Sequence, residues 1–418
     1  MTHREHKSVV VVGGGQAGLS VSYYLTQKNL DHVVLERHEK FHSWRVNRWD
    51  TFCLVTPNWQ CRLPDFPYAG DDPDGFMVKD EITDYLQAFA QSFTPPIVEN
   101  CEVTQITKRP GGGYLVDTSQ GNYSTDQVVI ATGGYDNPIV PPFAANLDPS
   151  ITQMHSVDYR RPSQMPEGAT LVVGTGQSGV QLMEDMHLEG RDVHLAVGPA
   201  PRSPRMYRGR DATDWMHALG HYHITIDKHP NPEHAVTKTN HYMTGRDGGH
   251  EIDLRKFARD GVSLYGSVSG MQGSTIQFLP DLGHNLDDAD DSYLSIRTAI
   301  DDYIAKNNID APIEPAFEKA WHPEHEITEI DCKAKGITSI LWAIGFRPNY
   351  GWIDVDVFDD VGRPVYQRGV CDAEGFYFIG LGWLNTWGSG RFLGIDEDSQ
   401  YLASVIAGRQ KSKMRAVS

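Results

Sequence analysis

The sequence predicts an α/β fold of two three-layer domains, and three observations support this prediction. The chain has 418 residues, which is more than one ordinary hydrophobic core needs. A strand, a glycine turn, a helix and another strand follow one another within residues 8–36. The same order returns within residues 170–197. A glycine turn between a strand and a helix is typical of parallel sheets that carry helices on both faces.

The composition limits the possible partners. The formal net charge of −18 disfavours nucleic acid and anionic membranes as partners, because both repel an acidic surface. No segment is apolar for long enough to cross a bilayer. The five cysteines form no CxxC pair, which argues against a disulfide framework and predicts a cytoplasmic protein. We expect a small-molecule substrate, and both a monomer and a homodimer remain open.

The periodicity of apolar residues predicts the individual elements. We expect helices at 16–29, 79–93, 177–188 and about 394–407. Strands are expected at 8–12, 32–36, near 101–107, 113–117 and 127–131, and at 171–173, 193–197, 339–344 and 376–379. Residues 37–78 show no period and are interpreted as an ordered functional loop region, while 200–330 is expected to be irregular apart from one element at 252–265.

The two repeats predict a discontinuous domain organisation. Residues 1–158 and 326–418 are expected to form one Rossmann-type domain, and residues 159–325 a second one that is inserted into it. The second domain would carry an irregular, histidine-rich insert.

The first glycine turn has the spacing GxGxxG, formed by Gly13, Gly15 and Gly18. Such a turn lets the backbone approach a pyrophosphate at the helix N-terminus. Glu36 follows 18 residues after Gly18, where a carboxylate can accept hydrogen bonds from the ribose of an adenosine. We therefore predict a dinucleotide site with these contacts: Gly13, Gly15, Gln16, Ala17, Gly18, Glu36 and Arg37.

The second turn repeats this spacing without the acid. The equivalent of Glu36 is Val197, so no carboxylate would repel the 2′-phosphate of NADPH. Arg202 and Arg205 follow closely, and guanidinium groups bind phosphate well. This pattern favours NADPH over NADH; the alternative is that these arginines belong to a solvated face. The predicted contacts of this site are Gly174, Gly176, Gln177, Ser178, Gly179, Arg202 and Arg205.

Two dinucleotide sites in one chain fit FAD together with a nicotinamide cofactor. Ala131-Thr132-Gly133 and Ala343-Ile344-Gly345 each end a strand with small residues, so we expect Thr132, Gly133 and Gly345 to lie against a cofactor. Gly394 opens the last helix, whose N-terminus would stabilise a reduced flavin, or it is only a capping glycine. The loop 380–394, with Asn385 and Arg391, is expected to approach flavin and substrate; a purely structural loop is the alternative.

Three further segments carry a family resemblance. His155, Tyr159 and Arg160 fit the second half of the pattern F-x-G-x-x-x-H-x-x-x-(Y/F/W)-(K/R/P), although Pro149 and Ile151 stand at its Phe and Gly positions. Residues 54–64 and the Asp65-Phe66-Pro67 turn match a segment that precedes a Pro-Phe-Pro turn, and Trp44-Arg45 matches a flavin-side tryptophan. In these features the chain resembles flavin-containing monooxygenases, and among them the YUCCA-like branch. The resemblance spans nearly the whole chain and is weakest at 206–250.

The resemblance implies a chemistry and roles for particular residues. FAD would be reduced by NADPH and react with O2 to a C4a-hydroperoxide, which transfers one oxygen atom to a small, nitrogen-containing molecule. Trp44 and Arg45 would line the flavin. Asn58, Trp44 and Asn385 are the candidate catalytic residues, whereas Trp44, Trp49 and Trp59 as core residues are the alternative. Tyr159 in place of a tryptophan favours heteroatom hydroxylation.

Other functions remain open at this point. An NADPH-dependent flavoprotein oxidoreductase or oxidase that does not oxygenate is the main alternative, and a nucleotide-binding sensor is a third. Cys53 and Cys61 have seven residues between them, which does not match a redox pair with four. Histidines gather within 217–250, but they complete no recognised metal-binding spacing, so a substrate-facing, proton-shuttling or solvated role is favoured and a metal site is the alternative.

Overall fold

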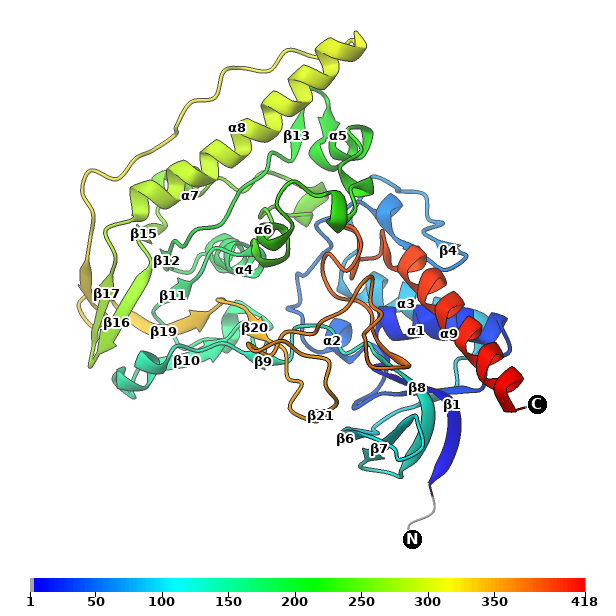
Figure 1. Cartoon of the computed structure of the whole chain (residues 1–418). Coiled ribbons are helices and arrows are strands. Elements are labelled where there is room, and N and C mark those ends of the chain that lie inside the picture. The colour runs from blue at the N-terminus through cyan, green and yellow to red at the C-terminus, as the bar shows by residue number, and fades with distance from the viewer. Residues whose placement is uncertain (1–3, 418) are drawn as a thin grey trace.

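The computed structural model describes residues 4–417, and two sheets organise them (Figure 1). The larger sheet has the order β21-β6-β7-β8-β1-β2-β5, with β22 beside β8. Its strands are β1 Glu5–Val12, β2 His32–Leu35, β5 Ile97–Val98, β6 Val103–Lys108, β7 Tyr114–Thr118, β8 Tyr123–Ile130, β21 Ile353–Asp354 and β22 Phe376–Phe378. The N-terminal and C-terminal parts of the chain therefore share one sheet.

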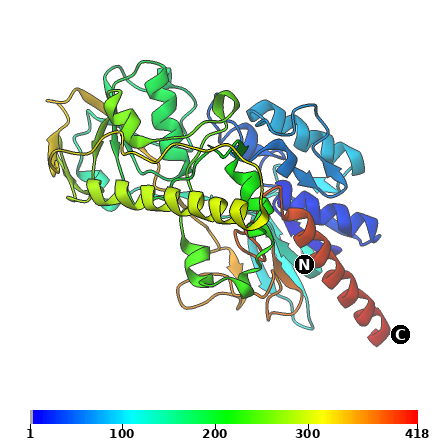
Figure 2. The same cartoon turned by 90° about the horizontal axis from the view of Figure 1, so that it is seen from above.

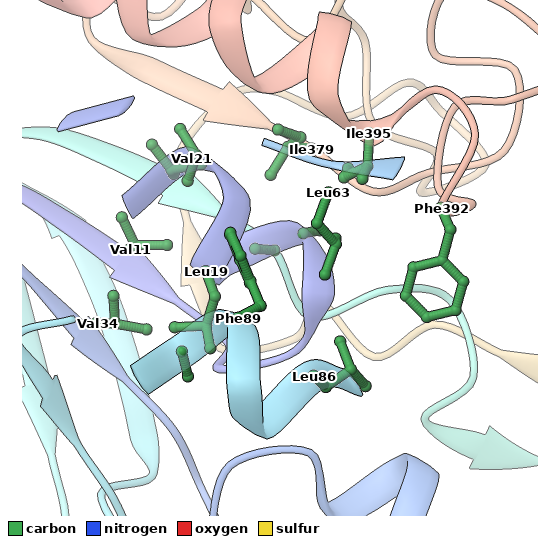
Figure 3. Packing of buried hydrophobic residues seen from close by; sticks show 14 of the residues in the cluster. Val11, Leu19, Val21, Val34, Leu63, Leu86, Phe89, Ile379, Phe392 and Ile395 are labelled. Carbon is green, nitrogen blue, oxygen red and sulfur yellow. The ribbon is translucent and has the colours of Figure 1, made fainter. Parts of the chain in front are cut away.

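The larger sheet is held together by a core that its helices cover. Strand β1 pairs in parallel with β2 and β8, and its apolar run is buried on both faces. The helices α1 (Gln16–Gln27), α3 (Lys79–Phe93) and α9 (Ile395–Val417) pack around this sheet. Figure 3 shows the side chains of this core meeting from β1, α1, α3 and the α9 segment. Each fully buried aliphatic or aromatic side chain contributes roughly 1.5–3 kcal/mol.

The smaller sheet is parallel throughout and has the order β10-β19-β11-β12-β15. Its strands are β10 Thr152–His155, β11 Ala169–Val173, β12 Val193–Ala196, β15 Ser263–Tyr265 and β19 Ile337–Trp342. The accompanying elements are α4 Gln177–Leu188, α7 Leu254–Arg259, α8 Leu282–Asn307 and the meander β16 Val268–Gln272, β17 Thr275–Phe278 and β18 Glu329–Asp331. In Figures 1 and 2 this green and yellow half lies beside the blue and red half.

The chain crosses between the two sheets twice, and the two crossings touch. The first crossing contains β9 (Asn137–Pro138) and the second β20 (Phe346–Arg347), which pair antiparallel. The predicted bounds 1–158 and 326–418 placed β10, β18 and β19 in the first domain, but these strands pair within the second half. Apolar patterning identifies a strand without revealing its partner strand, which is why the predicted bounds missed these pairings. The boundaries between the two domains lie at the crossings instead.

The region predicted to be irregular contains the longest helix among residues 4–417. Helix α8 spans 26 residues and buries positions that recur every three, four or seven residues: Leu282, Leu286, Ala289, Tyr293, Ile300 and Ile304. Aspartates interrupt this pattern and obscured it. The predicted element at 252–265 is two elements, α7 and β15. The remaining short elements are α2 His42–Arg45, β3 Arg62–Leu63, β4 Phe66–Pro67, β13 Met206–Tyr207, β14 Arg210–Asp211, α5 Ala212–Ala218 and α6 Pro232–Thr237.

Candidate functional site

The two glycine turns have the same backbone construction. Gly13 and Gly174 have φ angles of +111° and +106°, which only glycine adopts without strain. A Cβ atom on Gly18 would overlap the carbonyl oxygen of Gly13, and a Cβ on Gly179 would overlap that of Gly174. Each turn therefore requires glycine for its bend and for close packing of the helix on the strand.

Both turns leave space where a phosphate group would bind. A Cβ on Gly15 would meet no atom within 4 Å, and one on Gly176 would meet only Thr239 at 3.9 Å. Helices α1 and α4 begin directly after these glycines, and no side chain caps either N-terminus. Free N–H groups beside open space fit the pyrophosphate of a dinucleotide at each turn.

Each turn also touches one of the crossings between the sheets. A Cβ on Gly13 would lie 2.6 Å from the carbonyl oxygen of Ala131, and one on Gly174 would lie 2.8 Å from that of Ala343. Gly133 and Gly345 have φ angles of +72° and +93°, and both are open on the side where a Cβ would stand. The first crossing thus carries Thr132 and Gly133, and the second crossing carries Gly345. Both segments connect a nucleotide turn to the space between the domains.

The acidic residue beside the first turn is held in place by backbone donors. Glu36 accepts hydrogen bonds from the amide of Gly14 at 2.6 Å and from that of His38 at 2.9 Å. The neighbouring Arg37 forms an ion pair with Asp136 in the first crossing, at 3.1 Å. A carboxylate fixed beside the turn at the end of β2 fits the ribose of an adenosine.

The arginines beside the second turn have a different environment from the predicted one. Arg202 is 2% exposed and forms ion pairs with Asp253 at 3.1 Å, with Asp290 at 3.3 Å and with Glu251 at 3.3 Å. Arg205 is 1% exposed and bonds the carboxylate of Asp211 at 2.7 Å. These contacts do not support the predicted 2′-phosphate role. The partners of Arg202 come from segments distant along the chain, so the sequence did not reveal this pairing, whereas Asp211 lies only six residues after Arg205.

Trp44 lies at the opening of helix α1. Its indole N–H donates to the Gln16 side chain at 2.9 Å, and its ring stacks on Phe392 with centroids 5.5 Å apart. Gln16 in turn donates to the carbonyl of Gly390 at 3.4 Å. Arg45 is exposed and bonds Glu39 at 2.9 Å. Trp44 therefore joins the first turn to the loop 380–394.

Asn58 is buried, and both ends of its amide group are used within the protein. Its N–H₂ group donates to the carbonyl of Asp72 at 2.9 Å, and its oxygen accepts from the amide of Met77 at 2.8 Å. These contacts order the segment after α2 and engage both the N–H₂ group and the oxygen of Asn58 within the protein. The predicted catalytic role of Asn58 is not supported by this geometry. Its partners lie 14 and 19 residues further along the chain, so the sequence did not reveal these contacts.

The loop 380–394 packs against the first turn and against the histidine-rich residues 217–250, which we call the insert. A Cβ on Gly380 would lie 2.6 Å from the Cβ of Ala17, which opens α1. The Asn385 carbonyl accepts from the amide of Ile226 at 2.7 Å. Gly394 packs on the Gly388 backbone, directly before α9 begins. This loop therefore lies between the predicted flavin site and the insert.

The residues of the resemblance pattern connect the domains. His155 lies within hydrogen-bond distance, 3.2 Å, of the carbonyl of Gly345 in the second crossing. The phenol of Tyr159 donates to Asp185 at 2.7 Å. Asp185, which sequence reasoning missed, is 1% exposed and also accepts from Thr51 at 2.6 Å and from Arg246 at 2.8 Å. Asp185 lies in the predicted helix 177–188, and an acidic residue on the buried face of that helix could have marked it as a functional candidate.

The cysteines do not form a redox centre. Cys53 and Cys61 are buried free thiols, and burial raises the pKa of Cys53 to about 11 and that of Cys61 to about 12. Thiols of this kind are protonated and unreactive at neutral pH. Within residues 4–417, no group of three or more metal-binding side chains is placed to hold an ion. Across the same residues, no helix has the length and apolar character needed to cross a membrane.

Two dinucleotide turns joined by a double crossing define a flavoprotein oxidoreductase that uses a nicotinamide cofactor. Residues 10–216 match the family described as pyridine nucleotide-disulphide oxidoreductase. An uncharacterized CzcO-like oxidoreductase from Geobacillus kaustophilus is 31% identical over 95% of this chain and 97% of its own. A probable indole-3-pyruvate monooxygenase, YUCCA8 from Arabidopsis thaliana, is 29% identical over 42% of this chain and 44% of its own.

The solved structures agree on the fold. A flavin-containing monooxygenase from Stenotrophomonas maltophilia superimposes with a TM-score of 0.66 at 18% identity, covering 97% of this chain and 99% of the other. The chain belongs to the family of the CzcO-like oxidoreductases, and it is similar to flavin-containing monooxygenases in sequence over part of its length and in fold. It is an oxidoreductase, and its two dinucleotide turns fit FAD and a nicotinamide cofactor.

Proposed function

We propose that this enzyme is an NADPH-consuming monooxygenase that transfers one atom of O2 to a small molecule. Its similarity to flavin-containing monooxygenases, in sequence and in fold, supports the reaction class. When bound, FAD supplies the hydride acceptor and the oxygen chemistry, while the protein binds, orients and excludes water. We propose the nitrogen-containing substrate class on the resemblance alone.

The observation that favours oxygen transfer is the cover that the insert forms over the loop 380–394. The rings of Tyr222 and Trp387 lie 4.6 Å apart, and Thr225 pairs with Thr386 as an isolated bridge. Arg391 donates to the side chain of Asn240 at 2.8 Å. A covered site keeps water from the reacting centre, so an activated oxygen reaches the substrate before it is lost as peroxide.

The first turn and its neighbours would hold FAD. The N–H groups at Gln16 and the Gly13 bend face the pyrophosphate space, and Glu36 faces the ribose position. Trp44 and the loop 380–394 would then flank the flavin end. The second turn, opened by Gln177 and Ser178, would hold NADPH during reduction.

The test is a turnover experiment under ¹⁸O2. The purified enzyme is supplied with NADPH and a panel of amines, thioethers, nitriles and 2-oxo acids, and products and peroxide are measured in parallel. The proposal predicts that one panel member gains a single ¹⁸O atom for each NADPH oxidised. Peroxide equal to the NADPH oxidised, with every panel member, would instead establish a flavoprotein oxidase. Retained FAD that NADPH never reduces would establish a nucleotide-binding sensor.

A further inference from the structure

Asp185 is a buried acid in helix α4, and its three hydrogen bonds come from three separate segments of the chain. It is 1% exposed. One carboxylate oxygen accepts from the hydroxyl of Thr51 at 2.6 Å and from the guanidinium of Arg246 at 2.8 Å, and the other accepts from the phenol of Tyr159 at 2.7 Å. Burial and the bond to Asp185 raise the pKa of Tyr159, so its phenol stays protonated and donates. All three donors therefore point at the same two oxygens.

Residues 49–52 form a short segment, which we call the arm, by which the first domain reaches into the second. Trp49 is 5% exposed and packs in the hydrophobic core of the second domain. The amide of Asp50 donates to the carbonyl of Arg160 at 2.8 Å, and Thr51 follows with its bond to helix α4. The arm is thus attached to the second domain at three successive residues.

The arm also reaches the first nucleotide turn. Phe52 packs against the hydrophobic cores of both domains, and its ring centre lies 6.2 Å from that of Trp44. Trp44 donates to the side chain of Gln16, the residue that opens α1. A series of contacts thus runs from the start of α1 through the arm to Asp185 in α4, the helix that begins directly after the second turn.

The neighbouring acid, Glu184, has a different kind of partner. It is also buried, at 2% exposed, and among residues 4–417 its carboxylate bonds only His250 of the insert, at 2.5 Å. Helix α4 and the insert both belong to the second domain, so this bond stabilises one domain. Asp185 differs because its bond to Thr51 crosses between the domains. A misplacement of about 1 Å between reacting groups slows a reaction roughly 100-fold, so such a crossing contact affects rate more than affinity.

We propose that Asp185 is a positioning residue, which holds helix α4 on the arm and so sets how the nicotinamide approaches the flavin. The step concerned is the transfer of a hydride, with its electron pair, from NADPH to oxidised flavin, which leaves NADP⁺ and the anionic reduced flavin. Asp185 takes no part in that transfer and acts through Thr51 and α4. This inference rests on the proposed function, because that function assigns FAD to the first turn and NADPH to the second.

The kinetic experiment is anaerobic reduction of the holoenzyme by NADPH, followed at the flavin absorbance over a range of NADPH concentrations. Asp185→Asn keeps the shape of the side chain. It should lower the limiting reduction rate at least about tenfold and leave the Kd of NADPH and the FAD content at the wild-type values. Thr51→Val should act in the same direction, and because Thr51 is exposed this substitution leaves the cores intact. Glu184→Gln is the matched control and should be reduced at the wild-type rate.

Amide hydrogen exchange provides a second readout, which needs no nicotinamide. In the protein without NADPH, the arm should exchange faster in Asp185→Asn and Thr51→Val than in the wild type, because the amide of Asp50 is hydrogen-bonded only while the arm is docked. In Glu184→Gln the arm should exchange at the wild-type rate.

Two results would overturn the proposal. One is equal slowing of reduction by Asp185→Asn and Glu184→Gln, and the other is unchanged reduction and exchange in Asp185→Asn and Thr51→Val. If Asp185→Asn does not fold, Thr51→Val decides between these outcomes. Wild-type flavin that NADPH never reduces would overturn this inference together with the proposed function, whereas peroxide in place of an oxygenated product would overturn the proposed function alone.

Discussion

The first and second nucleotide turns share a backbone and differ in their neighbours. Both begin with a glycine in the left-handed region, both pack a helix onto a strand through a second glycine, and both touch an alanine carbonyl in a crossing. Beside the first turn, Glu36 is held by two amides. Beside the second, Val197 is buried and the arginines are neutralised by aspartates.

This difference shows that the glycines set the shape of a dinucleotide site, while nearby side chains choose its ligand. A carboxylate at the first turn suits a ribose. The absence of a carboxylate at the second turn removes a repulsion toward a 2′-phosphate, even though Arg202 and Arg205 are engaged elsewhere. Changing equivalent residues in the two halves tests this division of roles.

The largest effects are expected from alanine at the two packing glycines. In Gly18→Ala the new Cβ overlaps the Gly13 carbonyl, so FAD retention should be lost. In Gly179→Ala the overlap lies at the other turn, so the protein should keep its FAD but be reduced by NADPH at least about 100-fold more slowly, the effect of misplacing the cofactor. Flavin absorbance and anaerobic stopped-flow reduction measure the two outcomes.

Gly408→Ala is the control, because a Cβ there would meet no atom within 4 Å. Equal loss of FAD in both test variants would contradict the assignment of one cofactor to each turn.

The next effect concerns the arginines beside the second turn. Arg202→Met removes the closest cation from the buried Asp253 and leaves Asp290 with Arg255 alone, which should lower the free energy of unfolding by roughly 3–5 kcal/mol. The preference for NADPH over NADH should not change. Urea unfolding and nucleotide titration of the same preparation provide both values. Normal stability together with a selective loss of NADPH would restore the predicted phosphate role.

A smaller effect is expected at Glu36. Glu36→Gln keeps the shape but removes the charge, so FAD should bind about 10- to 100-fold more weakly, which is the value of a charged hydrogen bond. The Kd follows from equilibrium dialysis of the apoprotein with FAD. Glu39→Gln, which changes a carboxylate paired with the exposed Arg45, should leave the Kd as it is. An unchanged Kd in Glu36→Gln would remove the ribose contact from the account.

The smallest expected effect is a pH dependence of stability at helix α4, which follows the second turn. His250 bonds the buried Glu184 on α4 at 2.5 Å, and this hydrogen bond is the main cause that raises the pKa of His250. Because the folded pKa is raised, this contribution to stability is present below the usual pKa and is lost as pH rises through the folded value. The partly exposed pair should contribute less than about 1 kcal/mol. Urea unfolding at pH 5.5 and 8.5 should show this loss in the wild type and not in His250→Gln; equal loss in both proteins would contradict it.

The sequence predicted the elements and turns whose causes are local. The GxGxxG turns, the helices at α1, α3 and α4 and the two-domain α/β class follow from spacing and periodicity. The partners of Arg202, Asn58 and β19 could not be predicted, because each is set by segments far away in the sequence. Helix α8 could have been found from its buried apolar spacing.

A crystal structure of the enzyme with FAD and NADP⁺ would test directly whether each turn holds its own dinucleotide. We expect the FAD ribose at Glu36 and its pyrophosphate at Gly15 and Gln16, with the NADP⁺ pyrophosphate at Gly176 and Gln177. A structure in which either turn is empty, or in which both adenines lie in one half, would contradict it.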